Sequence, residues 1–399
     1  MDFDVIVVGA RVAGASTAML LARGGLRVLA VDRARFPSDT LSTHQVQLPG
    51  VALLRRWGVL EELIARGTPP ARTVIFDAGP AVLRGAYPSF DGVDGVYSPR
   101  RTVLDARLIA AARAAGATVE ENFIVEGLTR DGDRVTGLTG RFKNGRSTTL
   151  TAKLVIGADG KNSTVAKEVG AREYRKRPPA SGVLYGYFAG LPLAGGEVYV
   201  RPDRMVTLWP TDDELTLVYV GMPAAKFAEA RTAGLPRMAR GIAGLGERIA
   251  AAQPAERVRG TIDVPGVIRR PYGPGWALVG DAGLVMDPIT GQGIGNALRD
   301  ADRLSRAILD GLALREYHRR RDAGRRPMYD LTARLAAFRP DPAGDTLFPA
   351  LAEDPARVTR FLGMLTGINP VRDIFGPAAL RRTVGLRGIA RILLARRKS

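Results

Sequence analysis

Hydrophobic residues near the start of the chain form two short runs separated by a stretch with helical character. Residues 4–8 and 26–31 are rich in Val, Ile and Leu and predict buried strands. Between them, residues 13–23 are small or straight-chain residues that favour a helix, and Gly24 and Gly25 end it. The order of strand, glycine turn, helix and strand predicts a βαβ unit with parallel strands.

Two later segments repeat the combination of an apolar strand, a glycine-containing turn and a helix. In "KLVIGADGKNSTVAK" the strand runs into Asp159 and Gly160, and Ser163 has the residue type of a helix N-cap. In "GWALVGDAGLVMDPITGQGIGNALRDADRL" a strand ends at Gly280 and Asp281. A second turn follows and opens a helix, and its residues are Pro288, Gly291, Gly293, Ile294 and Asn296. Glycines at such turns let the backbone approach a ligand closely.

Residues 71–97 and 176–267 have a different period. Their short strands, such as "GVLYGYFAG" and "ELTLVYVGMP", are separated by Gly, Pro and Asp, which predicts an antiparallel sheet. Aromatic residues alternate with smaller ones in these strands, so some are expected to line a cavity, although ordinary sheet packing explains the same pattern. These candidates for a substrate cavity are Tyr185, Tyr187, Trp209 and Tyr219.

The predicted fold class is α/β, with a Rossmann-like lobe that is interrupted twice by the antiparallel sheet. Residues 331–399 are predicted to form a helical C-terminal region. The expected discontinuous lobe takes residues 1–70, 98–175 and 268–330, and the sheet takes 71–97 and 176–267.

Composition excludes several kinds of site. The 399-residue chain has no cysteine, which excludes disulfides, thiolate metal sites and a cysteinyl cofactor link. Only His44 and His318 are present, so no metal centre is expected, and His318 lies in a charged stretch expected at the surface. No apolar run is long enough to span a membrane, and no signal peptide is expected.

The formal net charge of +18 raises nucleic acid and anionic membranes as partners. The arginines are dispersed and form no basic stripe interleaved with aromatics, so nucleic-acid binding is not expected.

The first turn, "DVIVVGARVAGAS", has Arg11 where the usual G-x-G-x-x-G pattern has its second glycine. Gly9 can make the tight turn, Ala13 is small, and Gly14 permits close packing of the helix on the strand. The second strand is followed by Asp32, which is the acid expected to contact a ribose. Arg33 comes next and is also a candidate for cofactor binding. The Arg11 guanidinium either lies along the phosphates of a dinucleotide or points to solvent.

In this order, the three motifs resemble those of FAD-dependent monooxygenases of the p-hydroxybenzoate hydroxylase type. The resemblance implies a lobe that binds FAD without a covalent link, with Asp281 accepting a hydrogen bond from the ribityl chain and the turn after Pro288 facing the flavin. The segment "PRRTVLDARLIAAA" is similar to the place where an arginine meets the cofactor, which implies this role for Arg101, although that arginine can equally flank a helix. Asp159 is similar to an acid linked with cofactor binding, although an acid at such a turn can equally be structural.

The segment after Asp32 passes near the flavin in this resemblance, so Ser42, His44 and Gln47 are candidates for the cavity wall. His44 is the candidate catalytic residue, since a histidine can act as an acid, base or hydrogen-bond donor. It can equally be a buried polar residue whose hydrogen bonds are satisfied.

The resemblance implies that NAD(P)H reduces FAD and that O2 reacts with it to form a flavin hydroperoxide, which transfers one oxygen atom to an apolar or aromatic small molecule. No second nucleotide motif is present, so NAD(P)H is expected to bind transiently. The protein would position the substrate and exclude water.

Of three alternatives, two stay open. Related flavoproteins reduce isoprenoid double bonds, and the apolar C-terminal region would suit such a lipid. Flavin halogenases share the lobe but carry a W-x-W-x-I-P motif and a catalytic lysine; here Trp57, Trp209 and Trp276 are isolated and Lys143 is the first lysine, so halogenation is not expected. The third is a non-enzymatic, membrane-associated interaction protein that binds FAD.

The last segment, "LRRTVGLRGIARILLARRKS", has seven Lys or Arg after residue 380 and no acid. Leu386, Ile389, Ile392 and Leu393 recur at helical spacing, so the segment either packs on the body of the protein or lies on an anionic membrane. The predicted location is cytoplasmic, with peripheral contact at the inner face of the membrane as the alternative. The oligomeric state is left open.

Overall fold

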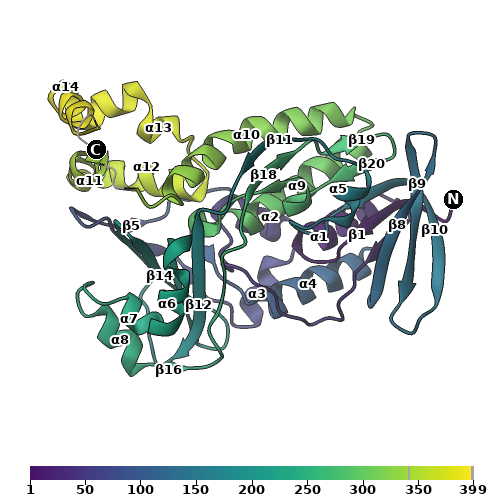
Figure 1. The fold of residues 1–399 in the computed structure, drawn as a ribbon, viewed down its shortest axis with the longest axis horizontal. Coiled ribbons are helices and arrows are strands. Elements are labelled where there is room, and N and C mark those ends of the chain that lie inside the picture. The colour runs from purple at the N-terminus through teal and green to yellow at the C-terminus, as the bar shows by residue number, and fades with distance from the viewer. Residues whose placement is uncertain (340–341, 397–399) are drawn as a thin grey trace.

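A parallel sheet forms the centre of the computed structural model, which describes residues 1–339 and 342–396 (Figure 1). Its strand order is β19–β20–β10–β1–β2–β7, and every pair is parallel except the edge pair β19–β20. The strands are β1 (Phe3–Val8), β2 (Val28–Val31), β7 (Thr118–Glu120), β10 (Ser147–Gly157), β19 (Tyr272–Gly273) and β20 (Trp276–Leu278). The parallel βαβ prediction is confirmed.

Alternate residues of β1 enter two different cores, as the two-residue period of a strand requires. Val5 and Val7 pack with one hydrophobic cluster that includes the helices, and Ile6 and Val8 pack with another that includes the β8–β9 ribbon. The helices on the first face are α1 (Val12–Arg23), α4 (Arg101–Ala114) and α9 (Gly293–Leu309). The ribbon strands β8 (Phe123–Asp131) and β9 (Arg134–Phe142) extend from the start of β10. The central sheet is thus buried on both faces.

A second sheet has the order β16–β12–β15–β14–β13–β4–β5, with β17 paired to β12. Its strands are β4 (Thr73–Asp77), β5 (Val82–Ala86), β12 (Ser181–Ala189), β13 (Gly196–Arg201), β14 (Arg204–Pro210), β15 (Thr216–Pro223), β16 (Gln253–Pro254) and β17 (Arg259–Thr261). The antiparallel prediction is wrong for one pair, because β4 and β13 are parallel. They belong to two separate segments of the chain, and the long connection between them permits the parallel arrangement that a hairpin forbids.

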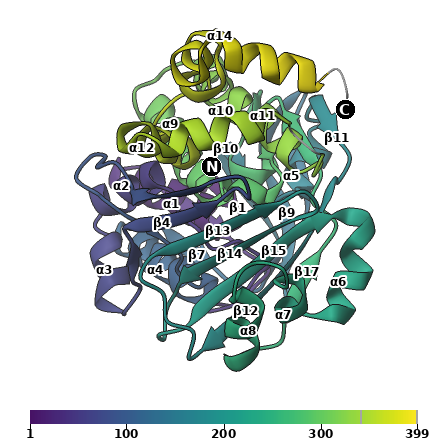
Figure 2. The same cartoon turned by 90° about the vertical axis from the view of Figure 1, so that its left-hand side faces the viewer.

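The two faces of the second sheet are covered differently (Figure 2). Side chains such as Leu184 and Val218 pack against a separate cluster that includes Leu235 and Ile249 of three short helices. Those helices are α6 (Phe227–Ala233), α7 (Leu235–Met238) and α8 (Leu245–Ala251). The opposite face belongs to the same cluster as α1, α4 and α9, so it faces the first lobe.

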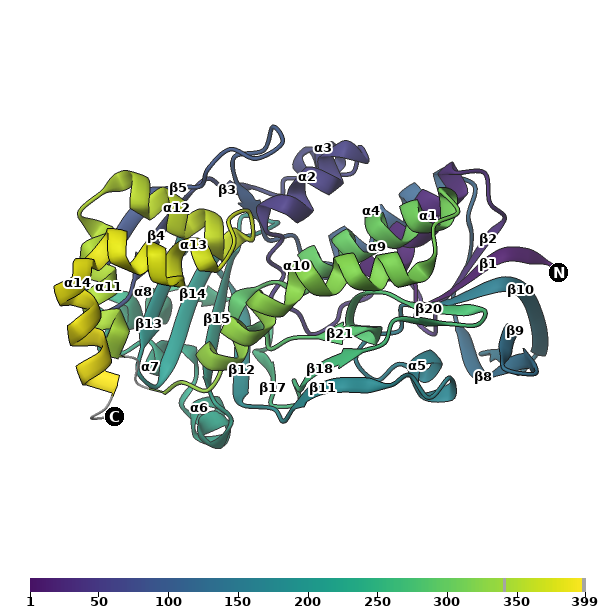
Figure 3. The ribbon, with the colours of Figure 1, turned by 90° about the horizontal axis from the view of Figure 1, so that it is seen from above.

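The described residues of the 331–399 region are helical, apart from short connections, as predicted. The C-terminal helices are α10 (Leu314–Leu335), α11 (Pro342–Ala352), α12 (Pro355–Thr366), α13 (Arg372–Phe375) and α14 (Pro377–Arg396). Phe348 of α11 and Phe361 of α12 pack against Phe76 of β4, with ring centroids 5.8 and 5.0 Å away, the first ring tilted and the second edge-on. These helices therefore close the β4–β5 end of the second sheet, at the end of the molecule opposite the β8–β10 ribbon (Figures 1 and 3).

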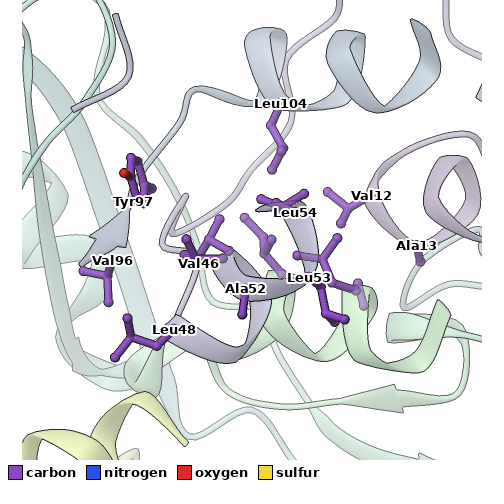
Figure 4. Packing of buried hydrophobic residues seen from close by; sticks show 14 of the residues in the cluster. Val12, Ala13, Val46, Leu48, Ala52, Leu53, Leu54, Val96, Tyr97 and Leu104 are labelled. Carbon is purple, nitrogen blue, oxygen red and sulfur yellow. The ribbon is translucent and has the colours of Figure 1, made fainter. Parts of the chain in front are cut away.

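The segment after β2 leads into α2 (Leu48–Arg56), whose buried side chains pack against neighbouring elements (Figure 4). Leu48 and Leu54 are fully buried, and Val46 pairs with Tyr97 in an isolated bridge. A Cβ atom on Gly50 would lie 3.2 Å from the Cα atom of Gly295, so α2 lies directly on α9. The remaining elements are short: α3 (Leu60–Ala65), β3 (Pro70–Ala71), β6 (Val96–Tyr97), α5 (Thr164–Glu168), β11 (Glu173–Arg177), β18 (Gly266–Arg269) and β21 (Leu284–Val285).

The close approach of β1 and α1 gives a test of the fold. A Cβ atom on Gly14 would lie 1.7 Å from the Gly9 carbonyl oxygen, which is backbone and cannot turn away. We expect Gly14→Ala to lower the free energy of unfolding by about 3 kcal/mol or more, measured by urea unfolding of the apoprotein. Gly293→Ala is the control, because no atom lies within 4 Å of its added Cβ. Equal losses in the two variants would contradict the packing.

Candidate active site

The register of the parallel sheet brings the ends of four strands to one edge. Val8 pairs with Val31 and with Gly157, and Gly157 pairs with Leu278. The residues that follow these strands therefore lie together at the carboxyl edge of the sheet, where open α/β sheets bind ligands. We call this place the carboxyl-edge site, and its predicted members are Gly9, Asp32, Asp159, Gly160, Gly280 and Asp281.

The first turn is held by Asp32. Its carboxylate accepts hydrogen bonds from the backbone N–H of Ala10 at 2.7 Å and of Ala34 at 2.8 Å. Gly9 has a φ of +96°, which favours glycine, and the start of α1 has no side-chain cap. The first N–H groups of α1 have no acceptor within the helix, so they can bind a phosphate.

Arg11 does not point to solvent. Its Nη1 donates to Asp105 Oδ2 at 2.7 Å, and its Nη2 donates to Ser38 Oγ at 3.0 Å. Arg101 binds the same carboxylate of Asp105 through Nε and Nη2, at 3.1 and 2.9 Å. Asp105 is fully buried, so two guanidinium groups share one buried carboxylate and leave an excess of positive charge beside the α1 N-terminus. Arg33 is exposed.

Asp105 is a site residue that the sequence analysis missed. The signal was present as an Arg and an Asp four residues apart, but that spacing is common on exposed helix faces. Only the packing of α1 against α4 places Arg11 on the same carboxylate.

Asp159 accepts hydrogen bonds from residues at the start of α5. One carboxylate oxygen accepts from Ser163 Oγ at 2.5 Å, and the other accepts from Thr164 N at 2.7 Å. Ser163 in turn accepts from Ala166 N at 2.9 Å, so the N-cap prediction is confirmed. Asp159 therefore fixes the start of α5, and its contact with a cofactor stays a prediction.

Asp281 is exposed, yet protein groups surround it. These surrounding groups partly desolvate the carboxyl and raise its pKa to about 6, while Arg101 nearby opposes the shift. The preceding Gly280 has a φ of +58°, and a Cβ there would lie 2.9 Å from Ala13 Cβ. The Gly280–Asp281 turn thus lies against the start of α1, and the carboxyl group of Asp281 is open to a ligand.

The second glycine turn leads into α9. Gly291 has a φ of +60°, and a Cβ there would lie 2.8 Å from Gln45 Oε1. The start of α9 has no side-chain cap, and Gly293 is exposed between buried residues, with no atom near its added Cβ. The buried residues beside it include Ile294 and Asn296, whose amide oxygen accepts from Arg299. The turn, which begins at Pro288, therefore presents bare backbone and a helix N-terminus.

Gln45 and Gln47 are buried at this turn, and Gln47 Nε2 donates to Gln45 Oε1 at 3.3 Å. The sequence analysis named Gln47 and missed Gln45. Gln45 and Gln47 are two positions apart, and both side chains lie near Gly291. The sequence could not show this proximity, because it depends on how the turn before α9 packs against residues 45–47.

His44 is fully buried on the second sheet's inner face, with its Nε2 atom 2.7 Å from the Tyr187 hydroxyl. Burial, together with the charges of Arg101 and Arg100, lowers the pKa of His44 to about 3. The imidazole is therefore neutral at ordinary pH and cannot act as a proton-donating imidazolium. Its Nδ1 atom is buried without a hydrogen bond of good geometry, and the Ser42 backbone, which raises the pKa of His44 against these effects, is a polar group beside the ring.

The four predicted aromatic residues share one face of the second sheet. Tyr185 lies directly opposite Tyr219 on the neighbouring strand, and the His44 ring lies 5.3 Å from the Tyr185 ring. The hydroxyls of Tyr185 and Tyr219 are buried without a hydrogen bond of good geometry. Burial raises the pKa of Tyr185 to about 12, and the Ser42 backbone opposes this shift. Trp209 Nε1 donates to Thr207 Oγ1 at 3.0 Å. This face therefore combines apolar surface with unpaired polar atoms.

His318 lies away from this site and is not a free surface residue. Its side chain is 27% exposed, and its Nε2 lies 3.1 Å from the Tyr174 hydroxyl and 3.5 Å from Asp322 Oδ2. The surface prediction therefore holds only in part, because the side chain is partly covered by Tyr174 of β11 and Tyr272 of β19.

Comparison with known proteins identifies the class. A model of the FAD binding domain family matches residues 2–330. The site and this match together define an FAD-dependent oxidoreductase, and the chain belongs to the FAD binding domain family.

Relatives within this group carry out different reactions. The chain is 30% identical over 356 residues to 6-methylpretetramide 4-monooxygenase of Streptomyces rimosus, covering 83% of this chain and 79% of the relative. It is 26% identical over 343 residues to menaquinone reductase of Mycolicibacterium smegmatis, covering 79% and 78%. It is also 26% identical over 307 residues to digeranylgeranylglycerophospholipid reductase 1 of Methanococcoides burtonii, covering 74% and 72%.

The fold is similar to solved flavoproteins. The p-nitrophenol 4-monooxygenase of Pseudomonas putida superimposes with a TM-score of 0.78 at 21% identity, covering 92% of this chain and 98% of the other. At that identity the likeness concerns the fold alone.

The residues at the carboxyl edge fit FAD. The uncapped start of α1 and the neighbouring arginines suit a pyrophosphate, and Asp32 and Asp281 offer acceptors to ribose and ribityl hydroxyls. The uncapped start of α9 suits the flavin ring, where charge accumulates on reduction.

Titration of Asp281 gives a test of this assignment. If FAD binds the ionised carboxylate, lowering the pH to about 5 leaves about a tenth of Asp281 ionised, so affinity should fall about tenfold from its value near pH 8. Flavin fluorescence quenching by the apoprotein measures this. Asp281→Asn should bind FAD weakly at both pH values, and the same pH step in this variant would exclude Asp281 as its cause.

The shared carboxylate gives a second test. In Asp105→Asn, two guanidinium groups lose their anionic partner in a buried place, so we expect a loss of about 3 kcal/mol in unfolding free energy. Added FAD should restore part of this stability, because its pyrophosphate supplies negative charge there. Thermal unfolding with and without FAD measures both effects. An unchanged midpoint without FAD would contradict the role of Asp105.

Proposed function

We propose that this protein is an NAD(P)H-dependent monooxygenase that transfers one oxygen atom from O2 to an aromatic small molecule bearing hydroxyl or carbonyl groups. The observation that carries the proposal is the set of unpaired polar atoms on the inner face of the second sheet. They are His44 Nδ1 and the hydroxyls of Tyr185 and Tyr219.

Each of these atoms is costly in the free protein. A buried polar group without a partner costs about 1–3 kcal/mol. Tyr185 and Tyr219 belong to one apolar cluster with Trp209 and Tyr187, and the His44 ring lies 5.3 Å from the Tyr185 ring. A substrate with hydroxyl or carbonyl oxygens would pair with them, whereas a plain hydrocarbon chain would leave them unpaired. This difference favours a polar-substituted aromatic substrate.

Bound FAD supplies the electron transfer from NAD(P)H and the activation of O2. The chain itself binds and orients the substrate and keeps water from the reacting atoms. His44 is neutral, so when its Nε2 accepts from Tyr187, its Nδ1–H is a donor available to a substrate oxygen. His44 then acts by positioning the substrate and not as a general acid.

A second candidate function is reduction of isoprenoid double bonds. It is favoured by the relatives named menaquinone reductase and digeranylgeranylglycerophospholipid reductase and by the large apolar face of the second sheet. In that reaction no oxygen enters the product.

The first experiment separates the two functions. The holoenzyme is incubated with NADPH or NADH and ¹⁸O₂, with 6-methylpretetramide as the aromatic probe and menaquinone as the isoprenoid probe, and products are analysed by mass spectrometry. Monooxygenation adds one ¹⁸O atom to the aromatic probe, chosen because a relative is named for it. A menaquinone product that gains two hydrogen atoms in an isoprenoid double bond, with no labelled aromatic product, would overturn the proposal.

The tyrosine hydroxyls give a sharper test on the chain itself. Tyr185→Phe and Tyr219→Phe each remove an unpaired buried hydroxyl, so the free protein should become more stable by about 1 kcal/mol. The same variants lose substrate contacts, so KM for the aromatic probe should rise about tenfold.

Tyr329→Phe is the matched control, because its hydroxyl is also buried without a hydrogen bond of good geometry, here beside Arg177, and belongs to a different cluster, with Ile268 and Leu284. It should gain stability and keep its KM. Unchanged KM values in both inner-face variants would disprove the role of these hydroxyls.

A further inference from the structure

The C-terminal helix α14 has two parts with different surroundings. Gly385, with a φ of +67° and a ψ of −179°, breaks the helix between them. In the first part, Ala379 is buried, and Leu380 and Val384 pack against the main hydrophobic cluster. The first part of α14 therefore packs on the body of the protein, which is one of the two alternatives predicted from the sequence.

The second part presents leucines to solvent. Leu386, Leu393 and Leu394 are 69%, 56% and 59% exposed, while Ile392 is buried. Residues 386, 393 and 394 are separated by seven and eight positions, so they lie on one side of a helix. We call Leu386, Leu393 and Leu394 the leucine stripe.

Arginines accompany the stripe. Arg387 and Arg391 lie on the same helix, and Arg381 and Arg382 lie in the first part; all four are exposed and have no ion-pair partner among the described residues. No acidic residue occurs in the chain after Asp373. Arg397 and Lys398, which also belong to the basic segment, lie outside the described residues.

We propose that the second part of α14 docks on an anionic lipid bilayer and lies in its interfacial plane. An apolar stripe beside unpaired positive charges complements a surface of anionic headgroups above acyl chains. No described helix is long and apolar enough to cross a membrane. The helix lies at the outer end of the molecule, opposite the β8–β10 ribbon (Figures 1 and 3), so a flat surface can reach it.

A second copy of the chain is a poorer occupant. A symmetric dimer through this helix would place the arginines of one copy opposite those of the other, with no acid on α14 to pair with them. This proposal does not depend on the reaction at the flavin.

The test is co-sedimentation of the FAD-loaded full chain with vesicles. The vesicles contain phosphatidylcholine with phosphatidylglycerol, or phosphatidylcholine alone. We expect binding to the anionic vesicles that high salt weakens. Leu393→Glu/Leu394→Glu should weaken binding about tenfold or more, and Arg387→Ala/Arg391→Ala should weaken it about tenfold.

Two control variants make the same kinds of substitution as the α14 variants, but at other places on the surface. Ile64→Glu/Leu312→Glu changes two exposed apolar residues elsewhere, and Arg231→Ala/Arg237→Ala removes two exposed arginines of α6 and α7. Both controls should bind as the unchanged chain does, and flavin absorbance should be the same in all variants. Absence of vesicle binding by the unchanged chain, or equal binding by the α14 variants, would overturn the proposal. A dimer that Leu393→Glu/Leu394→Glu dissociates, without vesicle binding, would assign the stripe to a second copy instead.

Discussion

The parallel register of the central sheet is the constraint on which the rest of the structure depends. Pairing of Val8 with Val31 and Gly157, and of Gly157 with Leu278, brings four strand ends to one edge. A glycine or an acid lies within two residues after the end of each strand, and the starts of α1 and α9 have no side-chain cap. Because a one-residue slip would turn every buried side chain to the opposite face, the packed core protects this alignment.

The charged side chains at the carboxyl-edge site are not fully paired with one another. Arg11 and Arg101 share the buried Asp105, and Asp281 keeps a carboxyl group open to a ligand although its surroundings disfavour ionisation. The free protein therefore carries both excess positive charge and a carboxylate without a partner. A dinucleotide with a pyrophosphate and several hydroxyls would complement both features, as the FAD binding domain family predicts.

The second sheet supplies a different environment from that of the first lobe. Its inner face is mostly apolar, with Trp209 and the Phe76 cluster, yet it contains the neutral His44–Tyr187 pair and two unpaired tyrosine hydroxyls. The helices α11 and α12 cover the β4–β5 end of this sheet, where Phe348 and Phe361 pack against Phe76. The last described helix, α14, follows these helices, and it has exposed apolar and basic side chains.

The sequence by itself determined the βαβ unit, the three strand-to-helix turns, the acid at the end of β2 and the Ser163 cap, because periodicity, glycine and capping residues act over a few neighbouring positions. Only the tertiary structure decided that Asp105 joins Arg11 to Arg101, that His44 is neutral against Tyr187, and that β4 and β13 are parallel. It also divided α14 into a packed part and an exposed part. These features depend on burial and on charges brought together from distant segments, and neither quantity can be read from local spacing.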